Sequence, residues 1–105
     1  MLSIYSVSLQ VTRECVAIVR AIAVRDRNLA DQLDRASTAV PLHIAEADGL
    51  RGGLRRVRHT TALGEAREVC ACIDVAVAKG HIEWPPTLGS KLDHVIGVLV
   101  KVSRH

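Results

Sequence analysis

Apolar residues recur at helical spacing along most of the 105-residue chain, and no stretch alternates in the way a strand does. The pattern predicts four helices, spanning Val7–Arg25, Asn28–Ala47, Leu54–Lys79 and Thr87–Ser103. Short connections make successive helices antiparallel neighbours. The predicted fold is therefore all-α, an antiparallel up-down-up-down four-helix bundle that forms one domain over residues 1–105.

Each predicted helix carries an apolar stripe that we expect to face the core. The stripe of the second helix is Leu29, Leu33, Ala36, Val40, His43 and Ala47. The stripe of the third helix is Ala62, Ala66, Val69, Ile73 and Ala76. The first helix carries a further stripe, Val16, Val19 and Ala23, on a second face. A helix that is apolar on two faces indicates contacts between subunits.

Several residues mark where the predicted helices begin, end or bend. Asp26 or Asn28 is expected to cap the second helix, and Gly80 is expected to end the third in a left-handed conformation. Pro41 lies inside the second helix and leaves a carbonyl one turn earlier without its N–H donor. Trp84, in the connector before the last helix, is expected to cover one end of the bundle.

Two sequence blocks carry a family resemblance. The pattern Arg-Ala-x-x-Ser/Ala-Val-Pro-x-Asn-Ile-Ala-Glu-Gly is matched at Arg35, Ala36, Val40, Pro41, Ile44, Ala45 and Glu46. The pattern Ala-x-Gly-Ser-x-x-Glu-Leu is echoed at Ala62, Gly64, Glu68 and Val69. Over residues 29–82 the chain resembles bacterial four-helix-bundle proteins encoded in intervening sequences of 23S rRNA genes. It departs from them where His43 replaces asparagine and Glu65 replaces serine.

The resemblance implies an assembly and partners. What the resemblance implies for this chain is a homopentamer. A related bundle is the accessory variability protein of diversity-generating retroelements, a basic pentamer that binds the reverse transcriptase and nucleic acid. The resemblance thus implies that this chain associates with itself, and it makes nucleic acid and a reverse transcriptase the expected partners.

A basic cluster lies where the third helix is expected to begin. It consists of Arg51, Arg55, Arg56, Arg58 and His59. Because Arg51, Arg55 and Arg58 are four and three residues apart, we expect them to share one helix face. The glycine-rich stretch 49–53 leads into a helix N-terminus, whose free N–H groups attract anions. The pattern favours phosphate contacts without base readout, and the alternative interpretation is a solvated charged face.

A second set of polar residues is expected to be structural. The predicted polar network is Arg35, His43, Glu46 and Glu68. His43 falls on the apolar seam, so its imidazole requires a hydrogen-bond partner from Ser37, Glu46 or Glu65. Arg35 is the expected partner of the acidic residues, because its helix must pack beside the third helix. An ion pair there would fix the register of the two helices.

Other chemistries lack support in the pattern. No glutamate has a histidine three residues later, so we expect no metal site, and no nucleophile motif or cofactor motif is present. The odd number of cysteines, Cys15, Cys70 and Cys72, favours reduced thiols and a cytoplasmic location. The apolar run 15–24 is too short to span a membrane and contains Arg20.

These observations lead to one expected function and one alternative. The net charge of +3 is compatible with nucleic acid as a partner. We expect a non-enzymatic, oligomeric adaptor that binds the RNA or DNA backbone through its arginine-rich surface, as an accessory to a reverse transcriptase. The alternative is a structural scaffold for protein–protein interaction with no nucleic-acid role, which would use Trp84 and the second apolar stripe of the first helix.

Overall fold

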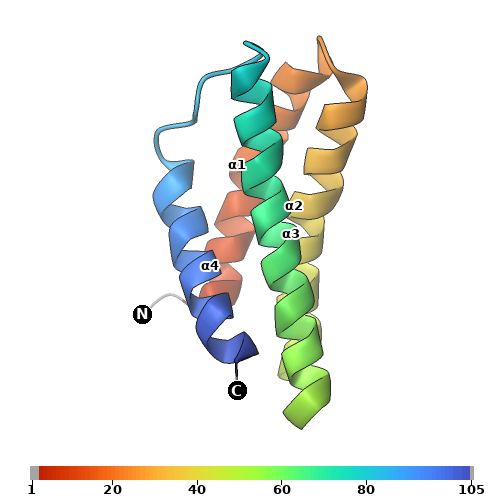
Figure 1. The fold of residues 1–105 in the computed structure, drawn as a ribbon, viewed down its shortest axis with the longest axis vertical. Coiled ribbons are helices and arrows are strands. Elements are labelled where there is room, and N and C mark those ends of the chain that lie inside the picture. Colours follow the sequence, from red (N-terminus) through yellow and green to blue (C-terminus); the bar gives the residue numbers. More distant parts are fainter. Residues whose placement is uncertain (1–2, 105) are drawn as a thin grey trace.

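The computed structural model describes residues 3–104 and shows four helices, α1 (Ile4–Ala23), α2 (Arg27–Asp48), α3 (Gly52–Ala78) and α4 (Leu88–Ser103). No strand occurs in this range, which confirms the all-α prediction. In Figure 1 the α1–α2 and α3–α4 connections lie at one end of the molecule, and the α2–α3 connection lies at the other. None of the four described helices combines the length and the apolar character that crossing a membrane requires.

The helices pack in a closed order, in which α1 and α3 each contact both α2 and α4. Three ion pairs join the borders of α2 and α3: Asp26–Lys79 at 2.8 Å, Arg35–Glu68 at 3.2 Å and Glu46–Arg58 at 3.1 Å. The partner's residue number falls along α3 as the number rises along α2. These two helices therefore pair in opposite directions. A hydrogen bond of 2.7 Å from Lys91 of α4 to Glu14 joins α4 to α1.

The core consists of small aliphatic side chains. The predicted stripe of α3 is fully buried, with Ala62, Ala66, Val69, Ile73 and Ala76 all 0% exposed. The predicted stripe of α2 is wrong at one position. His43 is only half-buried, and the neighbouring Ile44, which is 3% exposed, takes the place in the core. The apolar side chain is favoured there because burying it needs no hydrogen-bond partner.

The helix ends agree with the chemistry of their capping residues. Asp26 caps α2, and its side chain accepts a hydrogen bond of 3.1 Å from the backbone N–H of the third residue of that helix. Gly80 has φ of +76°, as predicted. Its N–H donates to Val77, and the N–H of His81 donates to Ala76, both at 2.9 Å. This pair of bonds is the Schellman motif, which satisfies the last carbonyls of α3.

The connection between α3 and α4 carries Trp84. Its indole N–H donates to Asp74 Oδ1 of α3 at 2.9 Å, and the residue remains 37% exposed. Trp84 is therefore tied to α3 and covers the bundle only in part. The second apolar face predicted for the first helix is also partial. Val16 is 48% exposed, whereas Val19 and Ala23 are half-buried and pack against the core.

Candidate nucleic-acid interface

The end of the α2–α3 hairpin, residues 48–58, is the most exposed part of the two helices, and we call it the basic end. Every residue from Arg51 to Val57 is exposed. In Figure 1 the hairpin extends past the end of α4. The helix lengths explain this, because α3 has 27 residues and α4 has only 16. The chain enters α3 through Gly52, whose φ of +60° favours glycine.

The structure divides the predicted basic cluster into free and paired arginines. Arg51, Arg55 and Arg56 are exposed and make no ion pair within residues 3–104. Arg58 is half-buried, and its Nε lies 3.1 Å from Glu46 Oε2 of α2. Three of the predicted arginines thus present uncompensated charge, and the fourth serves the packing of α3 on α2.

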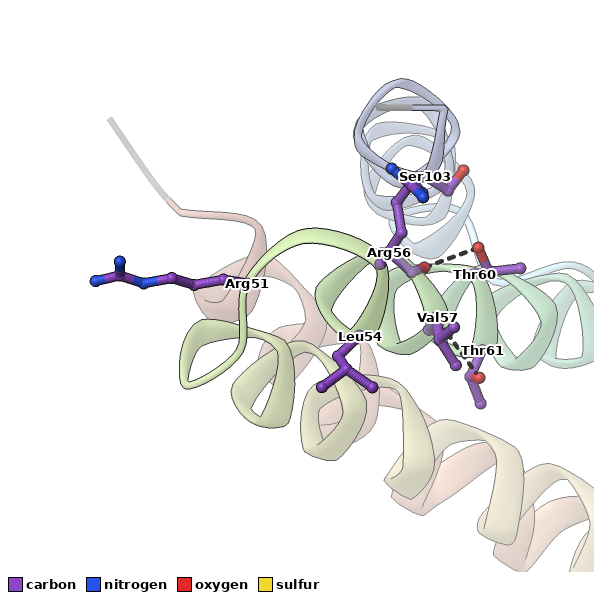
Figure 2. Close-up of a pocket in the computed structure, with 8 residues that line it drawn as sticks. Arg51, Leu54, Arg56, Val57, Thr60, Thr61 and Ser103 are labelled. Atoms are coloured by element: carbon purple, nitrogen blue, oxygen red, sulfur yellow. Dashed lines mark hydrogen bonds between the residues drawn. The ribbon is translucent and has the colours of Figure 1, made fainter.

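The free arginines do not all point the same way. In Figure 2, Arg56 reaches from α3 toward Ser103 at the end of α4, whereas Arg51 extends away from the bundle. Arg51 is the N-cap residue of α3, with an extended backbone, and its side chain makes no capping hydrogen bond. The positive charge is therefore spread over two sides of the basic end.

A groove of about 700 Å³ runs along the outer face of α3 between these arginines (Figure 2). Leu54 and Val57 line it and are 67% and 56% exposed. Thr60 and Thr61 also line it, and each hydroxyl donates to a carbonyl of its own helix at 2.9 Å. The groove therefore has apolar walls under a cationic rim. Sequence reasoning missed Leu54 and Val57, although their spacing of three among the arginines was a readable signal.

A second, smaller cavity of about 230 Å³ lies between α3 and the end of α4. It is lined by Gly52, Arg55, Arg56, His59 and Val102. His59 is only 8% exposed and is the buried member of the predicted cluster, where it lines this cavity. Burial lowers the pKa of His59, the charge of Arg55 lowers it further, and Asp48 acts in the opposite direction. A lowered pKa favours the neutral imidazole.

The predicted structural polar network is two separate clusters. Arg35 pairs with Glu68, and Glu46 lies between Arg58 and His43. The side chains of Arg35 and Glu68 are 69% and 38% exposed. An ion pair with that exposure contributes at most about 1 kcal/mol to stability, so its main effect is on register.

The hydrogen bonds expected for His43 are not formed. Its Nδ1 lies 3.6 Å from Glu46 Oε2, which is beyond hydrogen-bond distance, and it has no partner. The Ser37 hydroxyl donates instead to the carbonyl of Asp34. Oε2 of Glu65 is buried without a partner. The prediction was wrong because it placed His43 on the seam that Ile44 occupies.

The described residues bring no three His, Cys, Asp or Glu side chains together as metal ligands. The fold and the site define a four-helix, all-α protein with a basic end that carries a groove and a cavity. This fold is similar to the crystal structure of a protein with unknown function from the S23 ribosomal protein family of Bacteroides thetaiotaomicron. The TM-score is 0.86 at 15% sequence identity, over 98% of this chain and 100% of that chain. No family model and no curated protein matches the chain.

Proposed function

We propose that this protein is a non-enzymatic, oligomeric adaptor that binds the phosphate backbone of RNA or DNA through the basic end. The observation that carries the proposal is that Arg51, Arg55 and Arg56 are exposed and free of carboxylate partners within residues 3–104. A guanidinium group matches a phosphate in charge and in geometry. Neutralising phosphates releases their counterions, which gives affinity without sequence preference.

The backbone of α3 adds to this charge. The first helical hydrogen bond of α3 is from the Arg55 N–H to the Arg51 carbonyl. The preceding N–H groups are those of Gly52, Gly53 and Leu54, and the N-cap side chain does not bond to them. A helix N-terminus carries partial positive charge and attracts anions. Arginines and N-terminal amides therefore favour the same ligand at the same place.

The test is fluorescence anisotropy with a labelled RNA duplex and a labelled DNA duplex at about 50 and 200 mM salt. We expect affinity to fall steeply with salt, because each phosphate contact adds about −0.9 to the slope of log K against log salt. Reversal of both charges in R55E/R56E should abolish binding. The matched control is R25E/R27E, which changes the net charge equally at two exposed arginines around the α1–α2 connection, the opposite end of the molecule.

The two variants separate local contact from overall charge. Loss of binding in R55E/R56E with retained binding in R25E/R27E supports the basic end as the interface. Equal losses in both variants, or wild-type affinity in R55E/R56E, would overturn the proposal. Circular dichroism checks the fold, which we expect to survive because Arg55 and Arg56 are exposed and make no ion pair within residues 3–104.

Self-association forms part of the proposal. Tyr5, Leu9 and Val16 are 39%, 44% and 48% exposed and lie four and seven residues apart on α1, which supports an apolar contact face. The family resemblance implies a pentamer and a reverse transcriptase as partner, and the cysteine pattern favours a cytoplasmic location. The subunit would be an up-down-up-down bundle, as the opposed register of α2 and α3 and the positions of the connections support. Native mass spectrometry measures the subunit number.

The alternative function is a scaffold for another protein, and the apolar groove favours it. Leu54 and Val57 are exposed on a helix that could have carried polar residues there. Under this alternative, L54S/V57S would release a co-purifying protein partner and leave nucleic-acid affinity unchanged. Under the adaptor proposal, R55E/R56E would remove nucleic acid. The double variants L54S/V57S and R55E/R56E, both on α3, therefore distinguish the scaffold from the nucleic-acid adaptor.

A further inference from the structure

We propose that the cavity between the start of α3 and the end of α4 is a binding pocket for a single phosphate group. Arg55, Arg56 and His59 line it, together with Gly52 at the start of α3 and Val102 of α4. That the phosphate belongs to a nucleic acid rests on the proposed function. The pocket itself rests on the geometry of these residues.

His59 is the observation that points to a ligand. More than nine-tenths of this residue is buried, it lines the cavity, and its ring nitrogens are not among the enclosed atoms that lack a partner. The ring nitrogens make no hydrogen bond to residues 3–104, so their partner has to come from the cavity, as water or as a ligand. Because His59 lines the cavity, an occupant of the cavity can supply that partner. The neutral imidazole has one N–H, which can donate to an oxygen of the occupant.

The surrounding charge selects an oxyanion. Two arginines, Arg55 and Arg56, line the same cavity as His59. Gly52 begins α3, and no side chain caps this helix N-terminus. The carboxylate of Asp48 acts on His59 in the opposite direction to Arg55, and the effect of Arg55 is the larger. An occupant with negative charge and several acceptor oxygens is therefore favoured over a cation or a neutral solute.

The size of the cavity suits one phosphate. Its volume of about 230 Å³ exceeds the roughly 30 Å³ that one water occupies in the liquid by several times. A tetrahedral oxyanion fits with a few waters. Two chemical sources present such a group, the terminal phosphate of a strand and an internal phosphodiester, and both would meet the same arginines and imidazole.

The first experiment uses inorganic phosphate as the probe. Phosphate is titrated into the full-length protein, with chloride at equal ionic strength as the reference, while backbone amide and imidazole NMR signals are recorded. We expect saturable shifts at Gly52, Arg55 and His59. R55Q and H59Q should each weaken binding about tenfold, since a hydrogen bond to a charged group contributes about 1.5 to 3 kcal/mol. R67Q, at an exposed arginine farther along α3, should have no effect.

The overturning results are distinct. Shifts that do not saturate, or equal affinity in R55Q and the wild type, would remove the pocket. R55Q keeps this test valid even where H59Q unfolds, because Arg55 is exposed. Saturable phosphate binding without any nucleic-acid affinity would leave the pocket and overturn the adaptor function. Nucleic-acid affinity without saturable phosphate shifts would overturn the pocket and leave the adaptor function.

A second experiment distinguishes the two phosphate sources. Short oligonucleotides with a 5′-phosphate or a 5′-hydroxyl are compared by anisotropy in the wild type and in H59Q. A loss in H59Q confined to the 5′-phosphorylated strand assigns the pocket to a terminal phosphate. Equal losses with both strands assign it to an internal phosphodiester. Unchanged affinity with both strands would overturn the assignment to nucleic acid.

Discussion

The hydroxyl of Thr12 on α1 donates a hydrogen bond of 2.7 Å to the carbonyl oxygen of Ser37 on α2. Ser37 lies four residues before Pro41, so its carbonyl is the one that the proline deprives of a helical N–H donor. The position of Pro41 in the sequence predicts a carbonyl without a helical donor at this place. The structure shows that the neighbouring helix satisfies it, and α2 continues through the proline to Asp48.

Replacing Thr12 with valine should show how much stability is lost when the Ser37 carbonyl has no hydrogen-bond donor. T12V removes the hydroxyl with little change of shape, and we expect the free energy of unfolding to fall by about 1 to 2 kcal/mol. In the background of P41A the loss should be smaller, because the alanine introduced there has a backbone N–H that can bond to the Ser37 carbonyl. Urea denaturation of the four proteins measures this coupling. Equal losses in both backgrounds would contradict the explanation.

The contacts of Asp26 predict a dependence of stability on pH. The hydrogen bond from Lys79 lowers the pKa of Asp26 from its ordinary value of 3.8, and the Leu29 N–H lowers it further. A carboxylate with a lowered folded pKa stabilises the protein above its unfolded pKa, and this is lost as pH falls through the folded pKa. D26N should therefore lower Tm near neutral pH, and the difference should shrink as pH falls below 3.8 and vanish below the lowered pKa of the folded state.

Thermal unfolding followed by circular dichroism at a series of pH values makes this measurement. Asparagine also caps helices, so D26N tests the charge and keeps the cap. The control is D31N, which removes an exposed carboxylate of α2 that forms no ion pair within residues 3–104. A Tm difference for D26N that persists undiminished in acid would show that the charge is not its cause.

The three cysteines should differ in reactivity. Burial is the first cause that raises each pKa, and it raises the pKa of Cys15 to about 12. Cys15 and Cys72 are 1% and 4% exposed, whereas Cys70 is half-buried. Because the thiolate is the nucleophile, iodoacetamide at about pH 8 should label Cys70 first. Mass spectrometry of the native protein checks the order, and equal labelling of Cys15 and Cys70 would contradict it.

Glu46 should restrain the basic end. Its carboxylate pairs with Arg58, so E46Q should free that guanidinium for phosphate and raise nucleic-acid affinity about two- to tenfold at low salt. The slope of log K against log salt should become steeper by up to about 0.9, the amount that one added phosphate contact gives. E68Q makes the same charge change beside Arg35 and serves as the control. An equal gain in E68Q would mean that only net charge changed.

The apolar periodicity predicted the helices well because core packing and helix period coincide in a bundle. It failed at His43, since a stripe that advances by three or four residues leaves the choice between 43 and 44 open. The cluster of Arg55 and Arg56 was visible as charge without acidic neighbours. The pairing of Arg58 with Glu46 depends on the register of two helices, and the cavity depends on Val102 of α4. Both relations join residues that are far apart in the sequence, so the local pattern could not predict them.

The unequal lengths of α3 and α4 have a mechanical consequence. Val102 and Ser103, the last residues of α4, lie beside Arg56 and His59, so the first turn of α3 projects beyond the fourth helix. Backbone amides at that projecting turn should exchange with deuterated solvent faster than those near Ile73, which is fully buried in the core. If that exchange is faster, the arginines stand on a flexible tip, which would let them follow the curvature of the nucleic acid that we propose as ligand.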